Sequence, residues 1–417
     1  MASRLNINLK ATGLSRERLH WIDLFRGLAV LILFIDHANV LISHDAPPWL
    51  ARVVQGVFDV CISMFICVSG MTMSHLVADR KGNVGQTVRR YAVRGIVLLV
   101  GCHVLITLGI WPLYWDERSF AEILLLRWHI TDAIAFCLWL GPLLVLRLDD
   151  TKRLALVFVM LVGSRAIAAF WHPQVAGLGI AKEFLFGAND YDSSTHLLNA
   201  YPVGPYLAVF LLGTVVFSFV QRRIRESGPK GAIRLVAGLS VAVLAVGGAS
   251  VAAYLGMRSA LDAERYGDLL AFMYPSQTWG RLPLYLGATG LLLAAVLWRY
   301  LSRRRYTRLD FALTVWGRTS LFAFIVQYFV IQSIPAMLGW VGGVPVALLG
   351  PLVLAQVGIL FLVSYAYARA KGYVTAGEYH TIRACVLGSQ GTQTPSDCQD
   401  TSLGTDAPSS IASSPES

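Results

Sequence analysis

The sequence predicts an all-α, polytopic integral membrane protein with about ten transmembrane helices and both termini in the cytoplasm. Its 417 residues are 55% hydrophobic and only 14% charged, and the mean hydropathy is +0.57. In soluble domains about a quarter of the residues are charged. Apolar runs of about 20 residues, the length needed to cross a bilayer, recur along the whole chain.

The charges between these runs support a count of ten. With a cytoplasmic N-terminus, 25 of the 35 Lys and Arg residues fall in interior segments and seven in exterior ones. This alternation follows the positive-inside rule, and a missed or extra helix would disrupt it. It also accounts for the formal net charge of +10 without a nucleic-acid partner. The predicted spans are residues 20–43, 52–77, 92–112, 121–146, 153–171, 202–221, 233–256, 281–301, 311–336 and 344–368.

Composition divides the chain into three parts. We predict a basic cytoplasmic arm at residues 1–19, a ten-helix membrane domain at 20–370 and a disordered cytoplasmic tail at 371–417, where Ser, Thr, Pro and Gly accumulate. Two exterior loops, 172–201 and 257–280, are long enough to be binding loops or lids. Simple connectors are the alternative for both.

The first span, residues 21–37, reads WIDLFRGLAVLILFIDH and carries four ionisable side chains. Arg26 and His37 are eleven residues apart, which on a helix places them within about 20° of each other and about 16 Å apart along the axis. Ionisable groups inside a membrane helix favour a functional role. His37 suits a structural hydrogen bond, a proton relay or a general base. We expect Asp23 to neutralise Arg26 at i,i+3, and Asp36 points about 100° away from His37.

Three arginines, Arg89, Arg90 and Arg94, cluster at the cytoplasmic end of the third span. Ordinary positive-inside charge explains each of them singly. Together with Arg26 they would also suit the phosphates of a cytosolic donor such as an acyl-CoA.

Further polar residues lie in or beside apolar runs. His129 and Asp132 are spaced i,i+3 at the exterior side of the fourth span, so Asp132 could orient the His129 ring, or both could form a polar rim. His103 lies within the third span. In the second span, Gly70 permits close helix approach, and Ser69 is better suited to hydrogen bonding between helices than to nucleophilic catalysis.

Five segments combine in order into a recognisable pattern. They are Arg26 to His37 on the first span, MFICVSGMTMS (64–74), RRYAVRG (89–95), RWHITDAIAFCLWLGPLLV (127–145) and WGRTSLFAFIVQYF (316–329). Together they resemble motifs of the membrane acyltransferases of family 3, especially the periplasmic-glucan succinyltransferase branch. The heparan-glucosaminide acetyltransferases are more distantly similar. Gln327 stands where that family commonly has a His, and Asp132 where a Glu is more usual.

The resemblance implies transfer of a short acyl group from cytosolic acyl-CoA to a hydroxyl or amine of a glycan, lipid-linked sugar or small molecule. His37 would act as general base or would carry the acyl group itself. Acyl-CoA would be a substrate, with no permanently bound cofactor and no metal. The expected location is a bacterial inner membrane. The implied catalytic residues are Arg26, Asp36, His37, His129 and Asp132, and the implied donor-binding residues are Ser69, Arg89, Arg90 and Arg94.

Two other functions remain open at this level. A proton-coupled secondary transporter or flippase would also place Arg, Asp and His within spans. Against it, the sequence shows no internal repeat and no pair of helices interrupted by Gly or Pro. A scaffold or sensor whose polar residues only hold helices together is the third possibility.

Overall fold

The computed structural model describes residues 19–43, 46–78, 84–187, 197, 201–260, 266, 272, 281–302, 306–375 and 377–380. Within these ranges the regular structure is helical, with one isolated bridge between Ile42 and Val344. This confirms the all-α prediction. Residues 1–18 of the predicted arm, residues 381–417 of the predicted tail, residues 188–196 and 198–200 of the first long loop and most of the second long loop lie outside the described residues.

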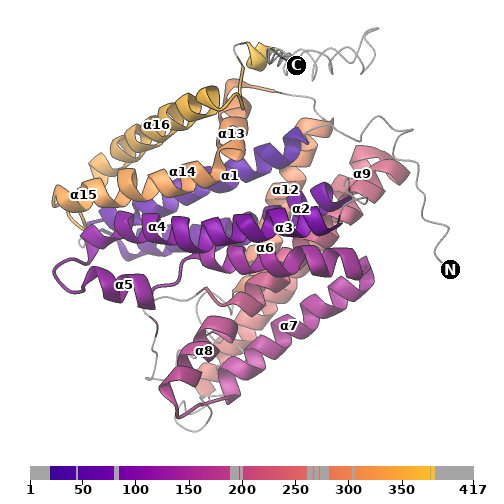
Figure 1. The fold of residues 1–417 in the computed structure, drawn as a ribbon, viewed down its shortest axis with the longest axis horizontal. Coiled ribbons are helices and arrows are strands. Elements are labelled where there is room, and N and C mark those ends of the chain that lie inside the picture. Colours follow the sequence, from indigo (N-terminus) through magenta and orange to yellow (C-terminus); the bar gives the residue numbers. More distant parts are fainter. Residues whose placement is uncertain are drawn as a thin grey trace, which may run out of the picture.

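The helices follow the predicted spans closely. In order they are α1 (His20–His37), η2 (Ala38–Leu41), α2 (Pro48–Ala78), α3 (Val84–Ile96), η3 (Val97–Cys102), α4 (His103–Ile110), η4 (Trp111–Leu113), α5 (Phe120–Leu126), α6 (Ile130–Arg147), α7 (Asp150–Phe170), α8 (Ala176–Phe186), α9 (Val203–Ala260), α12 (Leu282–Leu297), η5 (Trp298–Ser302), α13 (Arg308–Arg318), α14 (Ser320–Gln327), η6 (Tyr328–Ser333), α15 (Ile334–Met337) and α16 (Val346–Ala370). Figure 1 shows α1, α4, α14 and α16 running in a similar direction, with α7, α9 and α12 inclined to them.

Among the described residues, nine helices are long and apolar enough to cross a membrane. The difference from ten arises at α9, whose 58 residues cover the sixth and seventh predicted spans. About 20 residues suffice for one crossing. Gly228 interrupts α9 with φ 69° and ψ 178°, a conformation open to glycine, and Pro229 follows it.

The ninth predicted span, 311–336, is divided. α13 ends at Arg318, and Thr319 leaves the helical conformation with φ −107° and ψ 18° before α14 begins. Figure 1 shows α13 standing steeply against α14. Only the segment Ser320–Met337 is long and apolar enough to cross the membrane.

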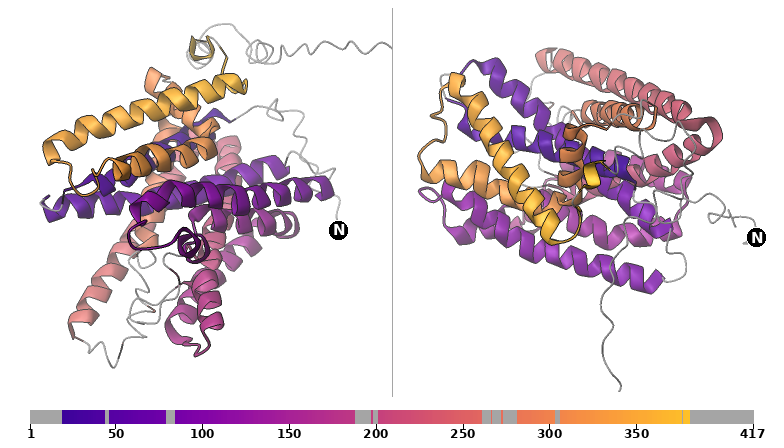
Figure 2. Two further views of the ribbon diagram at one scale, coloured as in Figure 1. Left: turned by 60° about the vertical axis from the view of Figure 1, so that its left-hand side comes forward. Right: turned by 90° about the horizontal axis from the view of Figure 1, so that it is seen from above.

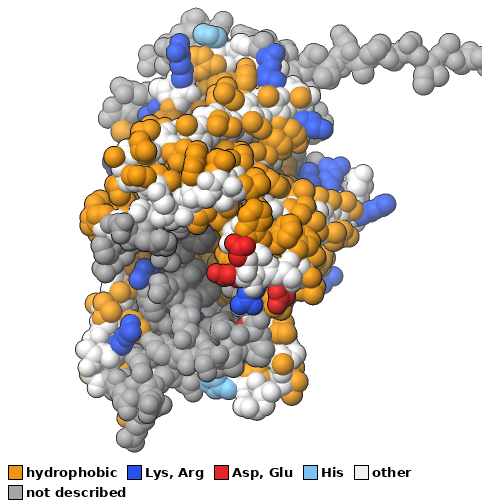
Figure 3. Space-filling model, turned by 90° about the vertical axis from the view of Figure 1, so that its left-hand side faces the viewer, with side chains coloured by type: hydrophobic (Ala, Val, Ile, Leu, Met, Phe, Trp, Pro, Cys, Tyr) orange, Lys and Arg blue, Asp and Glu red, His pale blue; other side chains and the backbone are white. Residues whose placement is uncertain are grey.

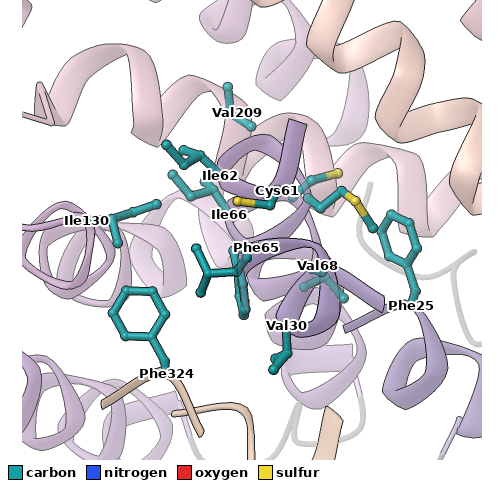
Figure 4. Close-up of a cluster of buried hydrophobic side chains, with 14 of the residues drawn as sticks. Phe25, Val30, Cys61, Ile62, Phe65, Ile66, Val68, Ile130, Val209 and Phe324 are labelled. Carbon is teal, nitrogen blue, oxygen red and sulfur yellow. The ribbon is translucent and has the colours of Figure 1, made fainter. Parts of the chain in front are cut away.

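The core surrounds α2. Figure 4 shows Cys61, Phe65 and Val68 of α2 facing side chains of four other helices, among them Val30 of α1 and Phe324 of α14. α1 packs between α2 and α13, and α16 lies against α13 and α14 (Figure 2). Consequently the first helix is enclosed by protein over most of its length.

The outside of the bundle is apolar. Leu354, Phe158 and Val246 expose 73%, 69% and 63% of their surfaces. Figure 3 shows hydrophobic side chains covering most of the described surface on the face in view. Such an exterior fits lipid, as the hydropathy predicted.

Backbones of α1 and α13 cross in direct contact. A Cβ on Gly27 would lie 1.8 Å from the Leu313 carbonyl oxygen, and one on Gly317 would lie 1.9 Å from the Asp23 carbonyl oxygen. Only residues without a side chain fit such a crossing, a common device between membrane helices. The crossing fixes the N-terminal half of α1 against α13.

Packing continues beyond residue 370, into the start of the predicted tail. Val374 is buried with Val315 and Ala368. Arg318 donates to the Tyr373 carbonyl at 2.6 Å and pairs with the Glu378 carboxylate. Residues 371–375 and 377–380 are therefore part of the folded domain.

Candidate active site

His37 is the last residue of α1 and is almost fully buried. Its ring lies edge-to-face on Tyr328 of η6, with ring centroids 5.1 Å apart. Its Nδ1 lies 3.0 Å from the Leu33 carbonyl oxygen. Because a carbonyl can only accept, Nδ1 carries the hydrogen in the neutral ring and Nε2 carries the lone pair. The local geometry therefore prepares Nε2 to accept a proton.

Asp36 lies beside this ring. Its Oδ2 is 3.5 Å from His37 Nδ1, and both side chains are buried. The spacing in sequence suggested that the two need not meet, but the backbone at the end of α1 brings them close. A carboxylate at this distance stabilises the imidazolium that forms when Nε2 takes a proton.

A second polar group joins α4 to α6. His103 Nδ1 lies 2.8 Å from Asp132 Oδ2, and His103 Nε2 lies 2.8 Å from the Leu124 carbonyl oxygen. The same Oδ2 accepts the backbone N–H of His129 at 2.7 Å. The ring that contacts Asp132 is thus that of His103, not that of His129 as the i,i+3 spacing suggested. At the third position of α6, the Asp132 carboxylate turns back to cap the helix N-terminus.

The hydrogen bonds also assign the protons of His103. Both ring nitrogens face acceptors, so the ring carries a hydrogen on each and forms an ion pair with Asp132. A ring with no free lone pair cannot act as a base. His103 and Asp132 therefore organise the site electrostatically.

His129 differs from the charged His103 in that its ring is neutral. It precedes the spanning part of α6, and its Nε2 lies 3.2 Å from Thr107 Oγ1. Burial, together with the nearby charges of His103 and Arg127, holds the pKa of His129 well below its usual value. His129 is consequently neutral at physiological pH.

Tyr328 contacts both the His37 ring and helix α4, which carries His103. A Cβ on Gly109 of α4 would lie 2.8 Å from Tyr328 Cβ, so η6 packs directly on α4. Arg127, between α5 and α6, interacts electrostatically with both His37 and Tyr328. The ends of α1, α4, α6 and α14 therefore meet in one polar region within the bundle.

Several buried polar atoms of this region have no hydrogen-bond partner among the described residues. On the α6 side they are Arg127 Nε, Thr131 Oγ1 and Asp132 Oδ1, and on the α14 side they are both amide atoms of Gln327. Unsatisfied buried groups are uncommon in folded proteins and point to a missing partner.

Arg26 is anchored at the other end of α1. Its guanidinium donates to the Thr72 hydroxyl of α2 and to the Gly317 carbonyl at 3.4 Å. Arg26 and His37 thus both contact the chain between α13 and η6, at Gly317 and Tyr328, so they share the helix face that their spacing predicted. Asp23, expected to partner Arg26, has its Oδ2 3.5 Å from Arg318 Nε.

The three predicted donor-binding arginines lie on a helix that does not carry the Arg26 contacts. Arg89, Arg90 and Arg94 are exposed on α3, which packs against α6, whereas Arg26 reaches α2 and α13. Ser69 donates to the Phe65 carbonyl of its own helix at 2.7 Å. Its hydroxyl is therefore engaged within α2.

The bundle also contains a pocket of about 230 Å³ between α7, α8, α9 and α12. Its lining is mostly apolar, with Ser164 and Arg165 as polar members. None of the predicted site residues lines it, so it is separate from the polar region around His37.

Six residues of the region lay outside the predicted site: His103, Thr107, Arg127, Thr131, Gln327 and Tyr328. Their signal in the sequence was weak, since single polar residues in apolar runs also serve as contacts between helices. Only the fold brings α4 and η6 to His37.

A comparison with protein families adds independent information. The family model described as "Heparan-alpha-glucosaminide N-acetyltransferase, catalytic" matches residues 18–257. That range includes every predicted site residue and ends within α9. A search of curated proteins finds no match.

Proposed function

The chain belongs to the family of heparan-alpha-glucosaminide N-acetyltransferase catalytic domains, and from this membership we propose its reaction. It transfers an acetyl group from cytosolic acetyl-CoA to an amine or hydroxyl of a glycan on the opposite side of the membrane. The observation that carries the proposal is the geometry of His37, whose Nδ1 faces the Leu33 carbonyl and Asp36 so that Nε2 keeps its lone pair. The match to a family of transferases favours this reaction over solute transport.

His37 acts as general base in the proposed mechanism. Its Nε2 takes a proton from the acceptor nitrogen or oxygen while that atom attacks the thioester carbonyl carbon. The tetrahedral intermediate then loses the sulfur, and the His37 imidazolium returns the proton to it. The products are acetylated acceptor and CoA thiol. Asp36 stabilises the imidazolium between the two proton transfers.

A covalent route uses the same residue. His37 Nε2 would attack the thioester itself, release CoA and pass the acetyl group to the acceptor. Acetyl-CoA without acceptor would then leave a transient acetyl label on the protein that rapid quenching can trap, whereas the general-base route leaves none. We favour the general base, and Asp36 beside Nδ1 stabilises the positively charged ring that forms on either route.

The donor reaches His37 along α1. Arg26 lies about 16 Å from His37 along the helix axis, and both contact the chain between α13 and η6. We propose that the pantetheine arm inserts along this face while its phosphates stay at the cytosolic side, which requires the packed helices to separate, because Val30 and Phe34 are fully buried there. Arg89, Arg90 and Arg94 contribute to phosphate binding only from the neighbouring face, since α3 packs on α6.

The acceptor binds at the α6 side. Arg127 Nε offers a donor and Asp132 Oδ1 an acceptor, and the Thr131 hydroxyl offers both. A sugar presents hydroxyls that satisfy each of these groups.

Membranes containing the protein test the reaction with radiolabelled acetyl-CoA and glucosamine. We expect acetylated glucosamine from the wild type, and none above background from His37→Ala of matched abundance and melting temperature. Normal transfer by His37→Ala would refute the role of His37. Uptake of solute without acetylation would favour a transporter.

A further inference from the structure

Gln327 occupies the centre of the buried face of α14. Its side chain has 0% exposure, and Phe324, Tyr328 and Ile331 on the same face are also buried. Neither Nε2 nor Oε1 of Gln327 has a hydrogen-bond partner in the part of the chain that the structure describes. The amide is thus fully buried and unsatisfied at both ends.

Such an amide is unfavourable in the folded protein on its own. Burying a polar group without a hydrogen bond loses its solvation and gains nothing in return. Inside a membrane protein, lipid provides no substitute partner. The position therefore makes physical sense when a bound molecule supplies one donor and one acceptor.

Gln327 also lies on the path proposed for the donor. The next residue, Tyr328, packs on the His37 ring at 5.1 Å. Ten residues earlier, the Gly317 carbonyl accepts from Arg26. On the chain that lines this path, Gln327 therefore stands between the Arg26 contact and the His37 contact, next to the latter.

The chemistry of the missing partner follows from the amide itself. A primary amide offers N–H donors and a carbonyl acceptor, and a secondary amide presents the matching acceptor and donor. Acetyl-CoA carries a neutral secondary amide two methylene groups from its thioester sulfur. When the thioester lies at His37 Nε2, this amide is the first polar group met on the way back along the arm.

We propose that Gln327 binds the amide of the donor nearest the thioester and so positions the reacting carbonyl at His37. This inference rests on the proposed function, because it assigns a contact to the donor of that reaction. Gln327 is a positioning residue for donor selection and takes no part in proton transfer.

The substitution Gln327→Met tests the inference, because Met has a similar volume and shape without the amide. In the free protein we expect an unchanged or higher melting temperature, since an unsatisfied group is removed. We expect the KM for acetyl-CoA to rise roughly tenfold, as for the loss of two neutral hydrogen bonds, with the acceptor KM unchanged. Gln356→Met is the matched control, since Gln356 of α16 is also buried and its Oε1 also lacks a partner.

Three outcomes would overturn the inference. An unchanged donor KM in Gln327→Met would show that the amide contacts no donor. A raised acceptor KM with an unchanged donor KM would assign the amide to the acceptor. A lowered melting temperature in Gln327→Met, absent in Gln356→Met, would show a structural role. If the wild type transfers no acetyl group, the proposed function itself fails. If the wild type is active and its KM for acetyl-CoA equals that of Gln327→Met, only the inference about Gln327 fails.

A ligand-side experiment needs no stable variant. S-acetyl-N-acetylcysteamine keeps the amide next to the thioester, and S-pentyl thioacetate replaces it with methylenes. Both compete with labelled acetyl-CoA for the wild type. We expect the amide compound to compete better, relative to its apolar analogue, in the wild type than in Gln327→Met. The inference would be contradicted if S-pentyl thioacetate competed as well as S-acetyl-N-acetylcysteamine for binding to the wild type. It would also be contradicted if the ratio of the two competition strengths were the same in the wild type and in Gln327→Met.

Discussion

His103 and the buried Asp132 form an ion pair between α4 and α6, with Nδ1 and Oδ2 2.8 Å apart across 29 residues of sequence. Asp132 Oδ2 also caps the backbone N–H of His129, so one carboxylate oxygen holds two segments of the site. The other ring nitrogen of His103, Nε2, donates to the Leu124 carbonyl oxygen. This pair therefore connects α4, the end of α5 and the start of α6.

Removing one member of this pair should destabilise the protein strongly. We expect His103→Ala to lower the free energy of unfolding by about 3–5 kcal/mol, because it leaves the Asp132 carboxylate buried without its cation. The double variant His103→Gln, Asp132→Asn should be less destabilised than His103→Ala, since no charge is left alone. Denaturation in detergent measures both. Equal losses in the two variants would argue against an ion pair.

Asp36→Asn should slow acetyl transfer without weakening substrate binding. The neutral amide no longer stabilises the His37 imidazolium, and we expect kcat to fall about 10²-fold with KM nearly unchanged. Steady-state kinetics with acetyl-CoA and glucosamine provide the measurement. Asp116→Asn is the control, because Asp116 is exposed. A rate for Asp36→Asn equal to that of the control would remove Asp36 from the mechanism.

Gly317→Ala should disrupt the crossing of α1 and α13. The added Cβ would lie 1.9 Å from the Asp23 carbonyl oxygen, and we expect a loss of about 1–3 kcal/mol from overpacking. Gly163→Ala in α7 is the matched control, because a Cβ there meets nothing within 4 Å. It should be neutral or stabilising by up to about 1 kcal/mol. Thermal melting of the two variants measures this difference, and similar melting temperatures would contradict a close contact between α1 and α13 at Gly317.

His129 should make the folded state sensitive to mild acid. Its pKa is lowered well below the usual value in the fold, so below about pH 6.5 the unfolded chain binds a proton that the folded protein does not. Stability is therefore full above pH 6.5 and declines as the pH falls toward the folded pKa. Denaturation curves at pH 7.5 and 5.5 should show a smaller loss for His129→Asn than for the wild type. The same loss in both proteins would show that His129 does not titrate on unfolding.

The fold was predictable because the bilayer restricts what a chain can do. Backbone groups in lipid must be satisfied within the segment, so a long apolar run becomes a helix. Accordingly, α1 together with η2, and α7, begin and end within a few residues of their predicted spans. In contrast, α6 begins nine residues later than its predicted span, which starts at 121. α5 and the extended residues 127–129 occupy that difference. The bend at Thr319 was not predictable, since neither Gly nor Pro occupies that position.

The part of the candidate site that could be predicted is its geometry on a single helix. The common face of Arg26 and His37 follows from helical periodicity alone. The partner of Asp132 did not follow, because His103 approaches it through the packing of α4 against α6. Likewise, the basic cluster on α3 could not be placed from sequence, since its distance from Arg26 depends on which helices α3 packs against.

Arg318 also limits how many times the described helices can cross the membrane. Its guanidinium reaches Asp23 near the start of the first spanning helix and Glu378 after the last. Residues that share one cation lie at one face of the bilayer, so an even number of crossings separates them. An odd total, with α9 passing through once, would put Asp23 and Glu378 on opposite faces. We therefore expect α9 to cross twice, with its break at Gly228 at the turning point, which gives ten crossings for the described helices.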